Sequence, residues 1–318
     1  MANLNVAVIG PNDYAKDLGK KGTVSDLTLY DLKQGTDTVT FIEASKYPER
    51  LAPLFFAVSM ADRALVIVEA INAQLGESMV MLHAAGIGKG YIILRNYLAP
   101  EQLAPLTKGT VLENYRFIED DKTAIREMLL QEARDQQRPS EGLGAVPIDH
   151  FFNVKGVGTV ILGYVPYGTI RKHDDLKALP TGKVAQVRSI QKHDDDFDEA
   201  VTGDRVGLAL KNIDVEDLDR GYVLTKDDKI KSDASVTATA DLVSFWKIPM
   251  KEGMVLHLGH WMQFIPARVE AVKDSGDPRR PTLTLALEKP VVHPAGSRAV
   301  LMHLDGGKLR VAGSISLP

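Results

Sequence analysis

The sequence predicts an α/β domain followed by two β-barrels. Strand-like and helix-like segments alternate over residues 1–145, which is typical of a doubly wound sheet. Beyond residue 145, short apolar runs are separated by turn residues and helical patterns are scarce, which favours small closed barrels. The chain of 318 residues is also longer than one hydrophobic core usually serves, so two or three domains are expected.

Short apolar runs mark the strands of the first domain. Such runs are typical of strands that are buried on both faces of a parallel sheet. The predicted strands are residues 6–10, 38–43, 64–68 and 90–94. Residues 110–112 and 115–118 are shorter and predict an edge element.

Three further segments of this domain predict helices. They are residues 47–60, 78–85 and 122–134. Pro48 suits the first turn of the first helix, whose apolar residues recur at helical spacing. Gly86 is a typical residue for the end of the second helix, and Asp121 can cap the start of the third.

A polar segment rich in Gly and Pro, residues 136–144, predicts a linker between the first domain and the barrels. We expect the three domains to span residues 1–145, 146–231 and 232–318. The predicted barrel strands include residues 158–165, 183–190, 205–210, 283–287 and 308–313.

The composition excludes several classes of protein. The chain has no Cys, which excludes disulfides, thiolate zinc sites, iron–sulfur clusters and Cys nucleophiles. The formal charge of -4 means that nucleic acid would need a local basic patch, and DNA is not expected as a partner. No apolar run approaches the ~20 residues of a membrane helix, and the N-terminus lacks the features of a signal peptide. We expect a cytoplasmic protein without membrane contact.

The second predicted domain contains short motifs in a fixed order. They are residues 154–160 (VKGVGTV), 163–165 (GYV), 168–170 (GTI), 174–176 (DDL), 187–191 (VRSIQ), 200–208 (AVTGDRVGL) and 219–224 (DRGYVL). Together they resemble the second domain of translational GTPases of the elongation factor Tu class, and most of all the selenocysteine-specific elongation factor branch. Residues 287–290, 296–301 and 311–314 resemble the last strands of the third domain of that family. The resemblance implies a P-loop-GTPase-like first domain followed by two barrels.

The resemblance also implies a phosphate-binding loop, G-x-x-x-x-G-K-S/T, after the first strand. Its backbone N–H groups wrap the phosphates, its Lys neutralises them and its hydroxyl binds Mg²⁺. The chain reads GPNDYAKD at this place. Gly10, Asp13 and Lys16 match the pattern. Ala15 replaces the second Gly, and Asp17 replaces the hydroxyl residue.

Three further nucleotide motifs of the family are lost. Residues 43–47 (EASKY) stand where the family has D-x-P-G-H, so Tyr47 replaces the His that orients the attacking water. Residues 95–98 (RNYL) stand where the guanine-reading N-K-x-D is expected. Residues 20–23 lead almost directly into residues 27–30, which leaves little room for a mobile switch loop.

These losses predict a pseudo-GTPase domain that retains the fold without the nucleotide chemistry. No catalytic residue, metal site or required cofactor is expected. Gly10, Asp13 and Lys16 are then vestigial phosphate-loop residues. Residual binding of GTP or GDP with Mg²⁺ remains the alternative.

Five residues are candidates for contact with RNA: Arg188, Gln191, Arg220, Arg279 and Arg280. By resemblance, Arg220 matches the Arg that contacts the tRNA end in relatives. Arg188 and Gln191 are three residues apart on a predicted strand, so they point to opposite faces unless a bulge intervenes. Arg279 and Arg280 form a basic turn suited to phosphate contact.

The leading hypothesis is an elongation factor-like protein that binds tRNA or the ribosome without hydrolysing GTP. Two alternatives stay open at this point. One is an atypical translation factor that still binds or hydrolyses GTP. The other is a regulatory module that uses the same fold for contacts with proteins.

Overall fold

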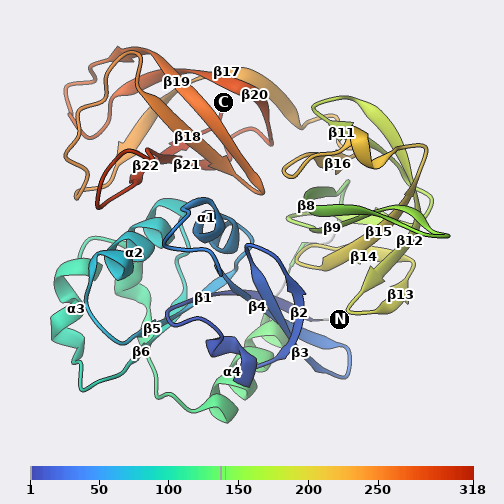
Figure 1. Cartoon of the computed structure of the whole chain (residues 1–318), viewed down its shortest axis with the longest axis horizontal. Helices are drawn as coiled ribbons and strands as arrows, with labels where there is room; N and C mark the ends of the chain where they lie inside the picture. Colours follow the sequence, from blue (N-terminus) through green and yellow to red (C-terminus); the bar gives the residue numbers. More distant parts are fainter. Residues whose placement is uncertain (1, 137, 140) are drawn as a thin grey trace.

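The computed structural model describes residues 2–136, 138–139 and 141–318. It confirms an α/β domain followed by two β-barrels, here named barrel 2 (β8–β16) and barrel 3 (β17–β22), and Figure 1 shows the three bodies around a common junction. Gln137 and Ser140 of the predicted linker, and Met1, lie outside the described residues. Within the described residues, no helix is long and apolar enough to cross a lipid bilayer.

A seven-stranded sheet in the order β2-β3-β4-β1-β5-β6-β7 forms the middle of the α/β domain. Its strands are β1 (Asn3–Ile9), β2 (Lys20–Val24), β3 (Thr28–Gln34), β4 (Asp37–Glu43), β5 (Arg63–Val68), β6 (Gly90–Leu94) and β7 (Arg116–Phe117). The five strands from β4 to β7 in this order are parallel. Their carboxyl ends meet at one edge of the sheet, where ligands of such folds usually bind.

Residues 20–34, where the sequence leaves little room for a mobile switch loop, form an antiparallel hairpin. β2 pairs with β3, and β3 pairs with β4, so the hairpin extends the sheet at one edge. In its turn, the N–H of Ser25 donates to the carbonyl of Leu27 at 2.7 Å. The chain between the first loop and β4 is therefore a β-hairpin, whose pairing shifts in register between Lys21 and Val24.

Helices cover both faces of the sheet. They are α1 (Ala52–Ser59), α2 (Ala73–Ala85), α3 (Pro100–Thr107) and α4 (Lys122–Asp135). The domain also has the 3-10 turns η1 (Tyr14–Asp17) and η2 (Val111–Asn114), while η3 (Val215–Asp217) lies between β15 and β16 of barrel 2. α1 and α2 lie between the sheet and barrel 3, and α4 lies on the opposite face (Figure 1). Asp121 caps α4 as predicted, because its carboxylate accepts from the N–H groups of Thr123 and Ala124 at 2.9 and 3.1 Å.

The predicted starts of the first two helices are wrong. α2 begins five residues earlier than expected, since Asn72 caps it by accepting from the N–H of Leu75 at 2.9 Å. α1 begins at Ala52, with Pro53 in its first turn, so Pro48 lies in the preceding turn. The hydroxyl of Tyr47 instead donates to the carbonyl of Gln74 at 2.8 Å, which ties this turn to α2.

Barrel 2 closes through six strands, β11-β16-β8-β9-β15-β12, because β11 also pairs with β12. Its strands are β8 (Ala145–Val154), β9 (Gly158–Tyr164), β10 (Thr169–Arg171), β11 (Asp175–Leu179), β12 (Lys183–Lys192), β13 (Asp195–Phe197), β14 (Glu199–Val201), β15 (Arg205–Lys211) and β16 (Val223–Thr225). Barrel 3 is a closed six-stranded barrel. Its strands are β17 (Lys231–Leu242), β18 (Val255–His260), β19 (Gln263–Lys273), β20 (Thr282–His293), β21 (Arg298–Met302) and β22 (Val311–Ser316).

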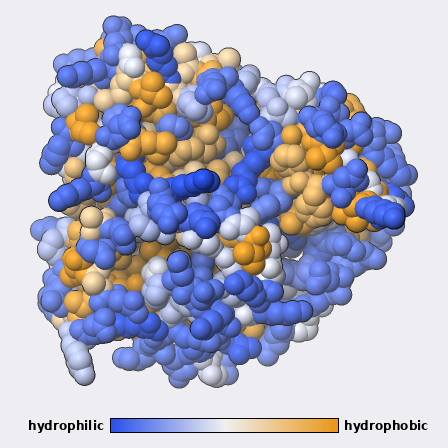
Figure 2. All heavy atoms as spheres, in the orientation of Figure 1, coloured by the Kyte–Doolittle hydropathy of each residue, from blue (hydrophilic) through white to orange (hydrophobic). Residues whose placement is uncertain are grey.

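One hydrophobic core extends from the α/β domain into barrel 3. The rings of Phe55 and Phe56 on α1 each lie 6.1 Å, between centroids, from the ring of Phe264 on β19. A Cβ at Gly259 of β18 would lie 2.6 Å from the ring of Phe55, so this close approach requires glycine. The outer surface is different: hydrophilic residues cover most of the face in Figure 2, and hydrophobic residues form patches over both barrels.

Candidate functional site

In the loop after β1, two backbone N–H groups donate hydrogen bonds to a side-chain carboxylate of the protein. The N–H of Asp13 donates to Oε2 of Glu43 at 2.8 Å, and the N–H of Ala15 donates to Oε1 at 2.7 Å. Glu43 ends β4, pairs with Val8 of β1 and is only 4% exposed. A single buried carboxylate therefore takes up two N–H groups of the loop in which the resemblance predicts phosphate binding.

The surroundings of Glu43 act on its charge in opposite directions. Burial raises the pKa of its carboxyl, and the two backbone hydrogen bonds offset part of that effect. The loop then leads into η1, a 3-10 turn of four residues, and directly into β2. The positive end of a longer helix, which helps to bind anions in many folds, is not supplied by so short a turn.

The three residues that match the phosphate-loop pattern have different surroundings. Gly10 has a φ of 150°, and a Cβ there would lie 2.8 Å from the carbonyl of Ile67 on β5. The carboxylate of Asp13 accepts from the hydroxyl of Tyr30 at 2.7 Å, which is the main reason that its pKa is lowered. Lys16 is exposed and, among the described residues, forms no ion pair.

Charged side chains fill the region after β6 and β7. Arg95 lies 2.8 Å from a carboxylate oxygen of Glu69 and 2.5 Å from one of Asp120. Burial would raise the pKa of Asp120, but hydrogen bonds from Lys122, Tyr14 and Arg95 lower it to about 2. The Tyr14 ring centroid lies 3.2 Å from Nζ of Lys122 and 5.3 Å from the guanidinium of Arg95. Arg95, where the resemblance places the guanine-reading motif, is thus engaged by carboxylates of the protein.

Tyr47, at the position of the family's catalytic His, belongs to a contact between domains. Its hydroxyl, which donates to the carbonyl of Gln74, also lies 3.1 Å from Oε2 of Glu77 on α2. Glu77, which is 4% exposed, also accepts from the backbone N–H, Nε and Nη2 of Arg310 near barrel 3, at 2.8, 3.0 and 2.6 Å. The segment after β4 therefore contacts α2, and a buried ion pair joins α2 to barrel 3.

A cavity of about 370 Å³ opens beside the loop, at the carboxyl ends of β1, β4 and β5. Its charged lining residues, among those that the structure describes, are Glu43 and Glu69. Its amide lining residues are Asn12, Asn72 and Gln74. A cavity with acidic and amide groups and no lining cation is poorly suited to a triphosphate.

Arg220, the candidate for the tRNA end, is held by the α/β domain. Its Nη1 and Nη2 donate to the two carboxylate oxygens of Asp26 at 2.8 and 3.0 Å, and its Nε donates to the carbonyl of Asp149 at 2.9 Å. Its guanidinium also lies 5.1 Å from the ring centroid of Phe56. Asp26 lies in the turn between β2 and β3, so this bidentate pair joins the hairpin to barrel 2.

Arg188 and Gln191 are both exposed on β12. A bulge explains why two residues three apart on one strand are both exposed. The pairing of β12 with β15 shifts between Val187 and Ser189, so Arg188 is the extra residue. The guanidinium of Arg188 donates to the carbonyl of Val157 at 3.0 Å, whereas the amide of Gln191 donates to Asp196 at 3.0 Å. The two side chains therefore have separate partners on the barrel surface.

Arg279 and Arg280 lie in the turn between β19 and β20. Both residues line a polar cavity of about 290 Å³ between α2 and barrel 3, together with Arg298 and His83. The candidate RNA contacts are therefore divided between the surface of barrel 2, the junction at Arg220 and this cavity.

Asp26, Glu43 and Glu77 do not stand out in the sequence, although the structure gives them central contacts. The one signal for Glu43 is an acidic residue at the end of an apolar strand, where burial is expected. Its donors lie 28 and 30 residues away in the chain, and no local pattern predicts that contact. In the described part of the chain, no three His, Asp or Glu side chains come together in a way that could hold a metal ion.

Comparisons with known proteins agree with this architecture. The family model for elongation factor Tu domain 2 matches residues 158–225. An uncharacterized protein of Methanocaldococcus jannaschii is 37% identical over 315 residues, which cover 98% of this chain and 99% of that protein. The selenocysteine-specific elongation factor of the same organism is 26% identical, over 92% of this chain and 70% of the relative. The crystal structure of translation elongation factor SelB from Methanococcus maripaludis with the GTP analogue GppNHp has a TM-score of 0.82 and 24% identity, over 100% of this chain and 79% of that chain.

Proposed function

Because the chain belongs to the family of translational GTPase-like proteins of the elongation factor Tu class, and resembles its selenocysteine-specific members, we propose that it acts in translation without hydrolysing GTP. The α/β domain is then a pseudo-GTPase domain. The proposed partner is tRNA or the ribosome, and the proposed location is the cytoplasm. These partners follow from the family.

The observation that carries this proposal is the carboxylate of Glu43 on the N–H groups of Asp13 and Ala15. Concave sets of backbone N–H groups bind anions, and this set has an anion from the same chain. A phosphate at the same N–H groups would meet the Glu43 carboxylate, and like charges at hydrogen-bonding distances repel strongly. GTP with Mg²⁺ does not fit the residues that surround this loop.

Two other features support the same proposal. Arg95 is ion-paired with Glu69 and Asp120 at the place expected for guanine recognition. The segment expected to act as a mobile switch is the hairpin of β2 and β3, whose Asp26 holds Arg220. In both places, residues that would be expected to contact the nucleotide or respond to it instead contact other residues of the protein.

A titration with a fluorescent GTP analogue and Mg²⁺ tests the loss of nucleotide chemistry. We expect no saturable binding at micromolar concentrations and no release of phosphate. Translation elongation factor SelB from M. maripaludis, whose crystal structure contains the GTP analogue GppNHp, serves as the positive control for the assay. Micromolar affinity together with turnover would overturn the pseudo-GTPase proposal in favour of an atypical GTPase.

Binding of tRNA and ribosomes tests the second half of the proposal. We expect the dissociation constant for tRNA, measured by fluorescence anisotropy, to rise steeply with salt, with a log–log slope of several units, because phosphate contacts release counterions. Co-sedimentation measures binding to ribosomes. A protein that binds neither at low salt would contradict the proposed role.

A further inference from the structure

We propose that the cavity between α2 and barrel 3 is a binding site for a phosphate group. This arginine cavity is defined by Arg279, Arg280, Arg298 and His83, and it has a volume of about 290 Å³. The α/β domain contributes His83 from α2, and barrel 3 contributes the three arginines. The cavity is separate from the loop that contains Asp13 and Ala15.

The arginines of this cavity lack the ion pairs that hold arginines and lysines elsewhere. Within the described residues, no carboxylate lies within 4.0 Å of a side-chain nitrogen of Arg279, Arg280 or Arg298, although Asp241 and Asp277 line the same cavity. The cavity around Arg220 and Lys289 differs, because those cations pair with Asp26 and Asp219. Three arginines against two aspartates leave the arginine cavity with excess positive charge.

The backbone around the arginines is fixed. The N–H of Leu242 donates to the carbonyl of Arg279 at 2.8 Å, and the N–H of Arg280 donates to the carbonyl of Asp277 at 2.8 Å. Asp277 also accepts, through Oδ1, from the N–H of Arg279 at 2.9 Å. The turn is therefore tied to the end of β17, which fixes the backbone positions from which the side chains of Arg279 and Arg280 extend.

Arg298 and His83 add further donors to the cavity. Nη1 of Arg298 donates to the carbonyl of Ala84 at 3.2 Å and to the hydroxyl of Ser314 at 2.9 Å, which leaves Nη2 for a ligand. Nδ1 of His83 accepts from the N–H of Val111 at 3.3 Å, so Nε2 of the neutral ring carries the hydrogen. Burial lowers the pKa of His83, which favours this neutral donor.

This set of groups matches phosphate chemistry. A planar guanidinium donates two parallel hydrogen bonds to a phosphate, and several arginines recognise a multivalent anion better than a single carboxylate. Ser244 also lines the cavity, and its hydroxyl can donate to a remaining oxygen. An RNA backbone and a free nucleotide both supply such a phosphate. Two probes, one for each source, distinguish them.

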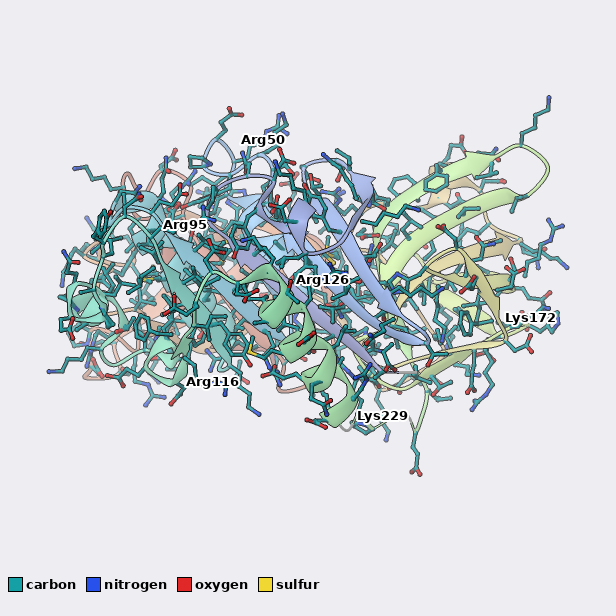
Figure 3. All side chains as sticks on the ribbon, turned by 90° about the horizontal axis from the view of Figure 1, so that it is seen from below. Arg50, Arg95, Arg116, Arg126, Lys172 and Lys229 are labelled. Carbon is teal, nitrogen blue, oxygen red and sulfur yellow. The ribbon has the colours of Figure 1, made fainter. Side chains whose placement is uncertain are left out.

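The test uses the whole protein and two probes. Inorganic pyrophosphate, measured by calorimetry, represents a free phosphate compound. A fluorescent single-stranded RNA without a terminal phosphate represents the backbone. The variants are Arg279→Gln with Arg280→Gln, and Arg298→Lys, which keeps the charge but removes the fork. Arg126→Gln is the matched control, since Arg126 is exposed on α4, in front of the sheet in Figure 3 and on the face opposite barrel 3. Circular dichroism checks that each variant is folded.

We expect the double variant to weaken pyrophosphate binding at least tenfold, Arg298→Lys to weaken it less, and Arg126→Gln to leave it within twofold. A parallel loss of RNA affinity, with a smaller salt slope, assigns the phosphate to RNA; an unchanged RNA affinity assigns it to a free compound. The inference fails if the unmodified protein binds neither probe, or if the double variant binds both as tightly. Intact tRNA binding with no effect of the variants would overturn only this inference, and arginine-dependent pyrophosphate binding without tRNA binding would overturn only the proposed function.

Discussion

The contact of Glu43 with the loop after β1 uses the chemistry by which proteins bind phosphate, but with a ligand from the same chain. Two backbone N–H groups converge on two carboxylate oxygens at 2.7 and 2.8 Å. A carboxylate attached to β4 loses no translational entropy on binding, whereas a free anion does. The internal anion therefore has an advantage over an external one at these two N–H groups.

We expect Glu43→Gln to destabilise the protein by about 1–2 kcal/mol. The amide keeps one acceptor, but its NH₂ group faces the second backbone N–H, so that donor is left unsatisfied in a buried place. Urea unfolding measures the change in the free energy of unfolding. The control is Glu69→Gln, since Glu69 is paired on the surface with Arg95 and should change stability by less than about 1 kcal/mol. Equal effects of the two substitutions would contradict the importance of the Glu43 contact.

For single residues, the sequence predicts which nucleotide-motif residues are lost better than it predicts the contacts that replace them. The departures at Ala15, Asp17 and Tyr47 can be read directly from the motifs. The partners of Arg220 and Tyr47, which are Asp26 and Glu77, lie 194 and 30 residues away in the chain. Contacts over such separations depend on how whole domains pack, and a single sequence carries no local signal for them.

Among the elements, the parallel strands and the caps at Gly86 and Asp121 are the most predictable parts. The predicted parallel strands are confirmed because continuous apolar runs have few alternatives in an α/β domain. The start of α1 was not predictable from spacing, since Tyr47 has helical periodicity but bonds to α2 instead. The bulge in β12 was also not predicted, because it depends on the pairing with β15. Pairing between strands overrides local alternation at such points.

β18 has a buried imidazole at its end. His260 is 5% exposed, and its ring lies 4.5 Å from the ring of Trp261, between centroids. Its Nδ1 lies 3.1 Å from the carbonyl of Arg298, while Nε2 has no partner among the described residues. Burial lowers the pKa of His260 to about 4, although the Arg298 carbonyl raises it somewhat.

This lowered pKa predicts a pH dependence of stability. The unfolded chain binds a proton at His260 below a pKa of about 6.5, whereas the folded protein binds it only below about 4. The free energy of unfolding should therefore decrease as the pH falls from about 6.5 to 4, by about 3 kcal/mol in total. Urea unfolding at several pH values measures the slope. His260→Gln should flatten it, and His173→Asn, at an exposed position, should not; a slope unchanged by His260→Gln would rule out this origin.

In the whole molecule, each of the three pairs of domains is joined by an ion pair between side chains. Arg310 with Glu77 joins barrel 3 to the α/β domain. Arg220 with Asp26 joins barrel 2 to the hairpin, and Lys289 with Asp219 joins the two barrels. The order of the domains was predictable from the motifs, but these pairs were not, because each one needs the packed arrangement of two domains.

We expect Glu77→Gln to weaken the attachment of barrel 3 to the α/β domain. The substitution leaves the Arg310 guanidinium without its buried carboxylate, which costs about 3–5 kcal/mol when a buried pair is broken. Differential scanning calorimetry should then show separate transitions for barrel 3 and the rest of the protein. Glu127→Gln, at an exposed position of α4, is the control and should keep a single transition. A single, unshifted transition for Glu77→Gln would show that the shared hydrophobic core alone couples the domains.

The hairpin of β2 and β3 has a consequence for how complexes of this protein would end. In the proposed function, the protein does not hydrolyse GTP and has no switch loop that hydrolysis would release. No chemical step therefore limits the lifetime of its complexes. The lifetime of a complex with tRNA or the ribosome would be set by its dissociation rate constant alone. Occupancy would then follow concentration and competition, as mass action requires, and the complex would form and dissolve reversibly.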